Sequence, residues 1–337
     1  MKIGKSDLSK ETLIVAEVGN NHEGSYALAE ELIGLAKEAG AGAVKFQTFL
    51  PEQFVMAKDA ARLERLRKFQ LSFAQFEQLK KFAEKTGILF FSTPLDLTSA
   101  KFLGSILSVI KVASGDNTLL PLLREVAAAK IPVILSCGMA TLSEIERSKE
   151  FIENEWKRLG YSAGELAVLH CISLYPAKPE QVGLENIRTL KAKLGCTVGY
   201  SDHTLGIEVA ALSTLFGARI IEKHFTINKN HSDFRDHQLS ADPADLKKLV
   251  ALVRHYETLI GDGKKSIGSE EQDMAKAVRR SMVAARGLKA GAVLSADDVY
   301  WLRPSGGISP EDESKALGKR LKRDVRGGEM LSLDMLG

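Results

Sequence analysis

Eight short apolar runs, each followed by a helix-like stretch, constrain the fold of this chain more than any other feature. The runs lie at 13–16, 43–46, 88–91, 108–112, 132–135, 166–169, 196–200 and 219–222. They are rich in β-branched residues and mostly continuous rather than alternating, which is typical of strands buried on both faces. Eight strand-and-crossover units that end near residue 260 predict an α/β fold, a closed (β/α)8 barrel.

An open doubly wound sheet is the alternative arrangement of the same units. Its dinucleotide-binding version carries a G-x-G-x-x-G segment after the first strand, and this chain has none there. The helical stretches are bounded by recognisable signals. Leucines recur on one face of 25–39, Thr141 and Glu144 form a capping box, and Gly87 and Gly195 end two more helices.

The chain changes character after the barrel, which is expected over residues 1–260. Residues 261–277, GDGKKSIGSEEQDMAKA, are polar and predict a linker. Residues 278–337 contain short β-type pieces broken by glycine and proline, which predicts a small loop-rich domain. Arg303 lies there between an aromatic strand and a Pro/Gly turn, a position from which a side chain can project.

Composition excludes several classes of protein. The net charge is +3 with acidic and basic residues mixed throughout, whereas nucleic-acid and membrane-surface proteins gather basic residues in one stripe. Three widely spaced cysteines within apolar runs are typical of reduced, buried thiols. The polar start lacks a secretory segment, and no apolar run is long enough to span a bilayer. We therefore expect a cytoplasmic protein.

Polar residues follow almost every predicted strand at its C-terminal end, where catalytic groups of such barrels lie. They are Glu17, Lys45, Gln47, Ser92, Thr93, Lys111, Ser114, Asp116, Ser136, His170, Ser173, Tyr175, Ser201, Asp202, His203, Glu222, Lys223 and His224. Lys45 and Lys111 lie inside apolar strands. A buried ammonium group is costly unless an anion offsets it, so a functional role is favoured for both lysines.

His203 in YSDHTLG and His224 in IIEKHFT follow neighbouring strands. Taken singly, each is typical of a loop histidine bonded to the backbone. Taken together, they are placed to reach one divalent metal, and imidazole ligands suit Mn, Zn or Fe(II). The lysines and hydroxyls suit a phosphate or carboxylate, and Glu17 and Asp116 suit proton transfer. The residues alone predict a metal-assisted enzyme acting on a small phosphorylated acid.

The whole chain resembles the sialic acid synthases, or nonulosonic acid synthases more broadly. The motifs that carry the resemblance are AEVGNNHEGS, VKFQTF, FSTP, IKVASGD, LSCGMA, LHCISLYPA, GYSDHT and EKHFT. The C-terminal GLKAGAVLSADDVYWLRPSGG is similar to the antifreeze-like, or SAF, domain that ends these enzymes. The family condenses phosphoenolpyruvate with an N-acylated aminohexose, usually N-acetylmannosamine, to give a nine-carbon keto acid and phosphate.

The resemblance also implies roles for residues of this chain. His203 and His224 correspond to the ligands of a divalent metal, Mn or Mg. Phosphoenolpyruvate is expected at Lys45, Lys111, Thr93, Ser114 and Ser201. The sugar and the reacting carbons are expected at Glu17, Gln47, Tyr175 and Asp236, with Asp233 as the substitute for Asp236. Asp116 stands where relatives often carry Glu, and Ser173 where many carry Asn. Arg303 is expected to reach the sugar's N-acyl group across a domain-swapped homodimer.

Three other functions remain open from the sequence. Legionaminic and pseudaminic acid synthases use diacetamido-trideoxy hexoses in place of N-acetylmannosamine. Synthases of the Kdo-phosphate or DAHP kind use phosphorylated sugars and lack the antifreeze-like tail. A barrel that binds carbohydrate without catalysis is the third, and the nearly complete set of strand-end polar groups counts against it.

Overall fold

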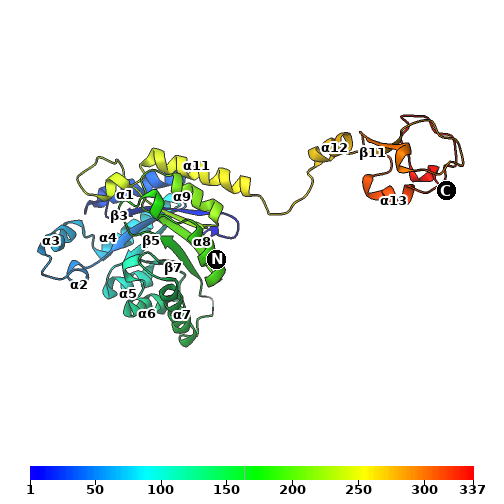
Figure 1. Cartoon of the computed structure of the whole chain (residues 1–337). Helices are drawn as coiled ribbons and strands as arrows, with labels where there is room; N and C mark the ends of the chain where they lie inside the picture. Colours follow the sequence, from blue (N-terminus) through cyan, green and yellow to red (C-terminus); the bar gives the residue numbers. More distant parts are fainter. Residues whose placement is uncertain (163) are drawn as a thin grey trace. The chain divides into compact units, whose positions relative to one another are not determined.

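The protein consists of two compact units, Met1–Gly261 and Asp262–Gly337 (Figure 1). The structure is a computed structural model that describes residues 1–162 and 164–337. The segment predicted as a linker over 261–277 contains part of a helix, α12 (Ser269–Val278). Among the described residues, no helix has both the length and the apolar character needed to cross a membrane.

The first unit is built on eight parallel strands, as the apolar runs predict. They are β3 (Leu13–Gly19), β4 (Ala43–Thr48), β5 (Leu89–Pro94), β6 (Ile110–Val112), β7 (Val133–Ser136), β8 (Leu166–Cys171), β9 (Thr197–Asp202) and β10 (Ile220–His224). Their hydrogen-bonded order is β5-β4-β3-β10-β9-β8-β7-β6. The two end strands, β5 and β6, contact each other. The sheet is therefore a nearly closed barrel, and the doubly wound alternative is wrong.

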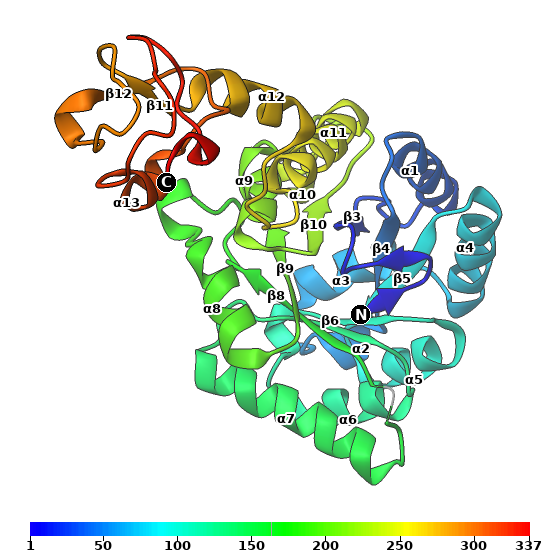
Figure 2. The same ribbon diagram turned by 90° about the vertical axis from the view of Figure 1, so that its right-hand side faces the viewer.

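Helices surround these strands (Figure 2). Those of the first unit are α1 (Tyr26–Glu38), α2 (Pro51–Phe54), α3 (Ala60–Phe69), α4 (Phe73–Thr86), α5 (Leu97–Ile106), α6 (Leu120–Ala128), α7 (Leu142–Arg158), α8 (Glu185–Leu194), α9 (Glu208–Leu212), α10 (Asp236–Leu239) and α11 (Pro243–Ile260). Short 3-10 turns lie at Ser114–Asp116, Pro179–Gln181 and Ser213–Phe216. Thr141 and Glu144 form the predicted capping box, and Gly87 and Gly195 end α4 and α8 in the left-handed conformation.

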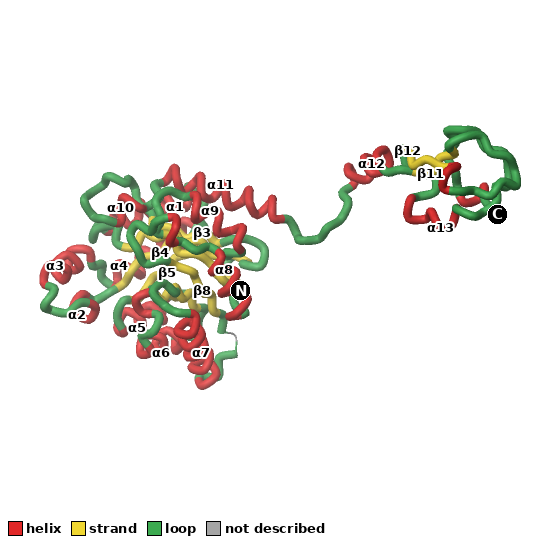
Figure 3. The backbone as a smooth tube through the Cα atoms, in the orientation of Figure 1, coloured by secondary structure: helices red, strands yellow, loops and turns green. Residues whose placement is uncertain are grey.

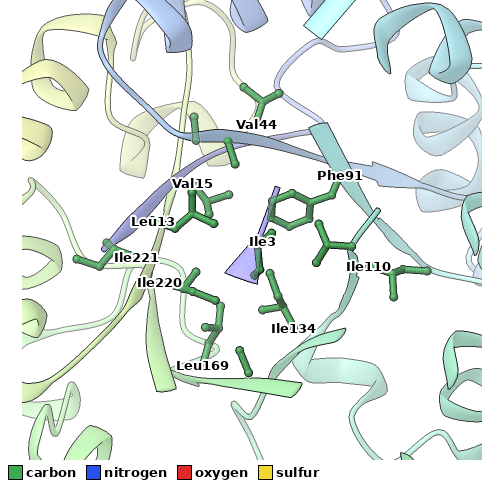
Figure 4. Close-up of a cluster of buried hydrophobic side chains, with 14 of the residues drawn as sticks. Ile3, Leu13, Val15, Val44, Phe91, Ile110, Ile134, Leu169, Ile220 and Ile221 are labelled. Carbon is green, nitrogen blue, oxygen red and sulfur yellow. The ribbon is translucent and has the colours of Figure 1, made fainter. Parts of the chain in front are cut away.

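A hairpin of β1 (Lys2–Ile3) and β2 (Ser6–Asp7) lies at the N-terminal ends of the barrel strands. The amino group of Met1 pairs with Glu165, which directly precedes β8. Ile3 is 2% exposed and belongs to the barrel's apolar core. Figure 4 shows its side chain inside the ring of strands, among residues such as Phe91 and Ile134. Ile3 therefore fills the N-terminal end of the barrel, which leaves the opposite end for a cavity.

The second unit has its own small core. It contains β11 (Ser281–Ala284), β12 (Val299–Leu302), α13 (Glu313–Ala316) and 3-10 turns at Ala296–Asp298, Pro310–Asp312 and Leu333–Met335 (Figure 3). The two strands pair antiparallel. Met282, Leu294, Leu321 and Leu331 are buried in one apolar cluster, so the unit has the core of an independent small domain.

Replacing Ile3 by Ala should destabilise the barrel, because it removes buried methyl groups and leaves a cavity among rigid strands. The expected loss is about 2–4 kcal/mol in the free energy of unfolding, measured by urea titration with circular dichroism. Lys5→Ala, an exposed change in the same hairpin, is the control and should leave stability within about 0.5 kcal/mol of wild type. Equal stability of Ile3→Ala and Lys5→Ala would contradict the filling role of Ile3.

Candidate active site

A cavity of about 1130 Å³ opens at the C-terminal ends of the barrel strands. Every strand contributes to its wall. The strand residues that line it are Glu17, Lys45, Gln47, Thr93, Lys111, Ser136, Cys171, Ser201, Glu222 and His224. This follows from the parallel arrangement, in which all eight strand ends meet at one end of the barrel.

The predicted site residues of the first unit come together in this cavity. They are Glu17, Lys45, Gln47, Thr93, Lys111, Ser114, Asp116, Ser173, Tyr175, Ser201, His203, His224 and Asp236. Asp233, the substitute for Asp236, also lines the wall. Arg303 belongs to the second unit, where its side chain is exposed directly after β12. The two predicted strand-end residues Asp202 and Lys223 instead form a buried ion pair with each other, at 2.8 Å.

Glu222 joins the two predicted lysines at the floor of the cavity. Its Oε1 lies 3.0 Å from the Lys45 Nζ and accepts a hydrogen bond from the Ser201 hydroxyl at 2.9 Å. Its Oε2 lies 3.4 Å from the Lys111 Nζ. Lys45 also lies 3.3 Å from Glu17. All four charged side chains are almost fully buried, so each ammonium has an internal anion before any substrate binds.

The pKa values of this cluster follow from burial and charge. Burial alone would raise the pKa of Glu222, but Lys111 and Lys45 together hold it far below its usual range. Burial raises the pKa of Glu17 to about 7, against the attraction of Lys45. Burial also lowers the pKa of Lys111 to about 8. The two carboxyl groups therefore differ: Glu222 is a fixed anion, and Glu17 can exchange a proton near neutral pH.

Several buried hydroxyls that line the cavity have no hydrogen-bond partner among the described residues. They belong to Thr93, Ser136 and Ser173. Buried polar groups in native proteins are nearly always bonded, so hydroxyls left open beside two lysines indicate a polar ligand. Burial also raises the pKa of Asp116 to about 6 in the same wall.

His203 and His224 face each other, with ring centroids 5.4 Å apart. The His203 Nδ1 lies 2.7 Å from the carbonyl oxygen of Ile172, so this nitrogen donates and Nε2 is left for another partner. The buried Nδ1 of His224 has no partner among the described residues. Burial and the nearby His203 hold the pKa of His224 well below its usual value, so its ring is neutral. Burial lowers the pKa of His203, but the Cys171 thiol and the Ile172 carbonyl more than offset this, so its pKa is raised. Two imidazoles this close together on the cavity wall are suited to a metal ion.

The described residues contain no group of three or more His, Cys, Asp or Glu side chains arranged to hold a metal. Any ion bound by the two histidines would therefore need water or substrate as its remaining ligands. Such open coordination is a property of catalytic rather than structural metal sites.

Aromatic and charged groups close one side of the cavity. The Tyr175 ring lies 4.1 Å from His203, between centroids, and the Arg235 guanidinium lies 5.1 Å from the Tyr175 ring. Arg235 Nε donates to Asp236 at 3.2 Å. On the β3 and β4 side, Gln47 donates to Glu17 at 3.1 Å. Tyr175 therefore lies in the wall of the cavity, against one of the paired histidines.

Some cavity residues were not assigned a role by sequence analysis. Glu222 was predicted to lie at a strand end but was given no role, although two buried lysines need an internal anion to stay charged. Glu23, Arg62, Arg65 and Arg235 also line the cavity, from loops and from α3. Their polar sequence context is that of a solvated surface, so no signal in the sequence distinguished them. His170, in contrast, lies 2.7 Å from the Val182 carbonyl and is held by the backbone.

The (β/α)8 barrel, the buried lysine–carboxylate cluster and the paired histidines define an enzyme-like site. Residues 32–265 match the NeuB family, and residues 279–337 match the SAF domain. The chain therefore belongs to the NeuB family, the sialic acid and nonulosonic acid synthases, and carries a C-terminal SAF domain.

Named relatives match over nearly the whole chain. It is 38% identical to an N,N'-diacetyllegionaminic acid synthase of Legionella pneumophila, over 94% of this chain and 92% of the relative. It is 36% identical to the enzyme of the same name from Campylobacter jejuni, over 96% and 99%. The structure of an N-acetylneuraminic acid synthetase from Leptospira borgpetersenii, in complex with citrate, is 33% identical with a TM-score of 0.76, and the match covers 81% of this chain and 94% of that one.

Stability should depend on pH through Glu17. The folded state keeps a proton on this carboxyl up to a pKa of about 7, whereas the usual value is 4.5. The unfolded state therefore releases that proton first, and folding stability falls as pH rises between those values. Glu17→Gln removes the titrating carboxyl and with it this loss of stability. As the pH rises from 4.5 to 7.5, the free energy of unfolding of the variant, measured by urea titration, should rise by about 1 kcal/mol or more relative to that of wild type.

Glu38→Gln, on the exposed face of α1, is the matched control for that measurement. Its stability should follow wild type at every pH. If the stability of Glu17→Gln also follows wild type at every pH, the folded protein does not keep a proton on Glu17 above its usual pKa.

Proposed function

We propose that this chain condenses phosphoenolpyruvate with an N-acylated aminohexose to form a nine-carbon 2-keto sugar acid and phosphate. The observation that carries the proposal is the pair of buried lysines, Lys45 and Lys111, beside open hydroxyls in a NeuB-family barrel. Phosphoenolpyruvate is a small anion with a carboxylate and a phosphate. Ammonium groups and hydroxyls are the donors that recognise both.

The buried anion Glu222 explains how two lysines can remain charged inside the barrel. A substrate anion adds negative charge at Lys111, whose pKa burial lowers to about 8. Binding therefore favours the charged ammonium and is expected to raise that pKa. The lysines neutralise the phosphate and carboxylate, while Thr93, Ser114, Ser173 and Ser201 orient them.

The reaction joins C3 of phosphoenolpyruvate to the aldehyde carbon of the sugar, consumes one water and releases phosphate. C3 is a weak nucleophile, so the aldehyde must be held in line with it. Glu17, with a pKa of about 7, is assigned to give a proton to the aldehyde oxygen as it becomes a hydroxyl. Gln47, Tyr175 and Asp236 are assigned to the sugar, and Asp116 to a second proton-transfer role.

A divalent metal, Mn or Mg, fits the two histidines. The assignment is supported by the His203 Nδ1 bond to the Ile172 carbonyl, which leaves Nε2 for a ligand, and by the His224 Nδ1, which has no partner among the described residues. When bound there, the ion would supply Lewis-acid polarisation of the sugar's carbonyl. The Ile172 carbonyl fixes the tautomer of His203, a function that groups behind a metal ligand commonly have.

Two acceptor sugars are candidates. N-acetylmannosamine is the acceptor expected from the family resemblance. A diacetamido-trideoxy hexose is supported by the names of the Legionella and Campylobacter relatives. Arg303 is assigned to the N-acyl group that both sugars share. In this proposal it reaches the cavity of a partner chain in a domain-swapped homodimer.

Phosphate release from phosphoenolpyruvate in the presence of Mn(II) tests the proposal. Each sugar is assayed separately, and the mass of the product is measured by mass spectrometry. We expect release that stops on chelation, with a nine-carbon keto acid as product. His224→Ala should lower the rate of turnover by about a hundredfold or more, because a metal ligand is lost. The variant should keep the circular dichroism of the wild-type protein.

Two outcomes would contradict the proposal. Release only with a phosphorylated sugar would favour a synthase of the Kdo-phosphate or DAHP kind. Binding of sugar with no phosphate release under any metal would favour a carbohydrate-binding protein. Full activity after exhaustive chelation would contradict the metal assignment but not the condensation reaction.

A further inference from the structure

A tight turn after β3 lies between two parts of the cavity rim that are distant in the sequence, the helix α3 and the loop 227–240. The turn comprises residues 20–24, and Glu23 within it has a φ of 47°. A side chain at Gly24 would place its Cβ 2.0 Å from the carbonyl oxygen of Lys68, at the end of α3. The turn is therefore pressed against α3. A non-glycine residue held in the left-handed region is uncommon and indicates local constraint.

The Glu23 side chain reaches the second part of the rim, the loop 227–240 that follows β10. Its Oε1 accepts a hydrogen bond from the His237 Nε2 at 2.9 Å and another from the Ser232 hydroxyl. The His237 side chain has no exposed surface, and that of Glu23 is about a quarter exposed. Both bonds end on the same oxygen of Glu23, so one acceptor atom holds the loop at two points.

A second residue of the turn holds the loop near its ends. Asn21 Nδ2 donates to the Phe225 carbonyl at 2.8 Å and to the Ser240 hydroxyl at 3.0 Å. The Ser240 hydroxyl in turn donates to the Asp236 carbonyl at 2.6 Å. The loop contains only the one-turn helix α10, so these side-chain bonds provide much of its order.

The anchored loop supplies one wall of the cavity with Asp233, Phe234, Arg235 and Asp236. Asp236 directly precedes His237, and Ser232 directly precedes Asp233. Ser232 also lines the cavity, and the two bonds to Glu23 bracket the other four wall residues. Phe234 adds an edge-on contact with the Phe69 ring of α3, at 5.1 Å between centroids, so the turn, α3 and the loop form one packed unit.

We propose that Glu23 is a positioning residue for the acceptor sugar, which holds the loop 227–240 so that Arg235 and Asp236 face the cavity. It acts as a hydrogen-bond acceptor for Ser232 and His237, and no proton is transferred. The inference rests on the proposed function, since the acceptor is defined there. A competing account exists because Glu23 itself lines the cavity. In that account its carboxylate would act as an acid or base on the substrate.

Glu23→Gln and Glu23→Ala separate the two accounts. Gln keeps an oxygen where Oε1 lies and so keeps both bonds without the charge, whereas Ala removes both. We expect Glu23→Ala to raise the acceptor KM about tenfold or more, with the phosphoenolpyruvate KM within about twofold of wild type. Glu23→Gln should stay within about threefold of wild type on both. Glu31→Ala, exposed on α1, is the control.

Hydrogen exchange of the full chain provides a readout that needs no turnover. Amides of 227–240 should exchange faster in Glu23→Ala than in Glu23→Gln, which should match wild type. Ser232→Ala removes only one of the two bonds. It should show an intermediate exchange rate, and it tests the inference if Glu23→Ala does not fold.

Two results would overturn the inference. Glu23→Gln as damaging as Glu23→Ala would assign a charge or proton-transfer role to Glu23. Unchanged exchange of 227–240 in Glu23→Ala would mean that Glu23 does not hold the loop. If the wild-type protein condenses no acceptor, the proposed function fails, and the exchange measurement still decides whether Glu23 anchors the loop.

Discussion

The carboxylate of Glu222, shared between Lys45 and Lys111, is the interaction on which the site depends. Two ammonium groups buried at the end of an apolar barrel would otherwise lose their charge or unfold the strands around them. With the Glu222 carboxylate oxygens 3.0 Å from Lys45 and 3.4 Å from Lys111, both ammonium groups can stay charged. Removing one partner of such a buried cluster typically costs about 3–5 kcal/mol, so the cluster is also part of the fold's stability.

The barrel makes this cluster possible through the close contact of strands β9 and β10. Glu222 and Ser201 are register partners on β10 and β9. Gly199 lies two residues earlier on β9, and a Cβ there would come within 2.3 Å of the Ile220 carbonyl oxygen. The absence of a side chain lets β9 and β10 approach. His203 directly follows β9 and His224 ends β10, so one strand pair positions both the central anion and the paired imidazoles.

Much of the fold could be predicted from the sequence, because parallel barrel strands carry a strong local signal. Continuous β-branched runs marked all eight strands, and the capping box at Thr141 and the glycine at Gly87 marked helix ends. Twelve of the thirteen predicted site residues that line the cavity follow from the rule that barrel strands present their C-terminal ends to one cavity. The thirteenth, Asp236, was predicted only from the family resemblance. The chemical roles assigned to them stay predictions.

What the sequence did not reveal depends on three-dimensional register. Glu222 could be placed at a strand end, but its pairing with both lysines follows from which strands are neighbours. The contacts of Glu23 with Ser232 and His237 join positions more than two hundred residues apart. Helix α12, which begins in the segment predicted as a linker, was missed because the helix has no buried face.

Calorimetric titration of phosphoenolpyruvate into wild type and Lys111→Met, without sugar, tests the central claim most directly. The account predicts binding to wild type and a dissociation constant at least about tenfold higher for the variant, because one cation of the anion site is lost. The Glu17→Gln variant, which keeps both lysines, should bind nearly as well as wild type. Equal affinity of Lys111→Met and wild type would contradict the claim that this cluster is the phosphoenolpyruvate site.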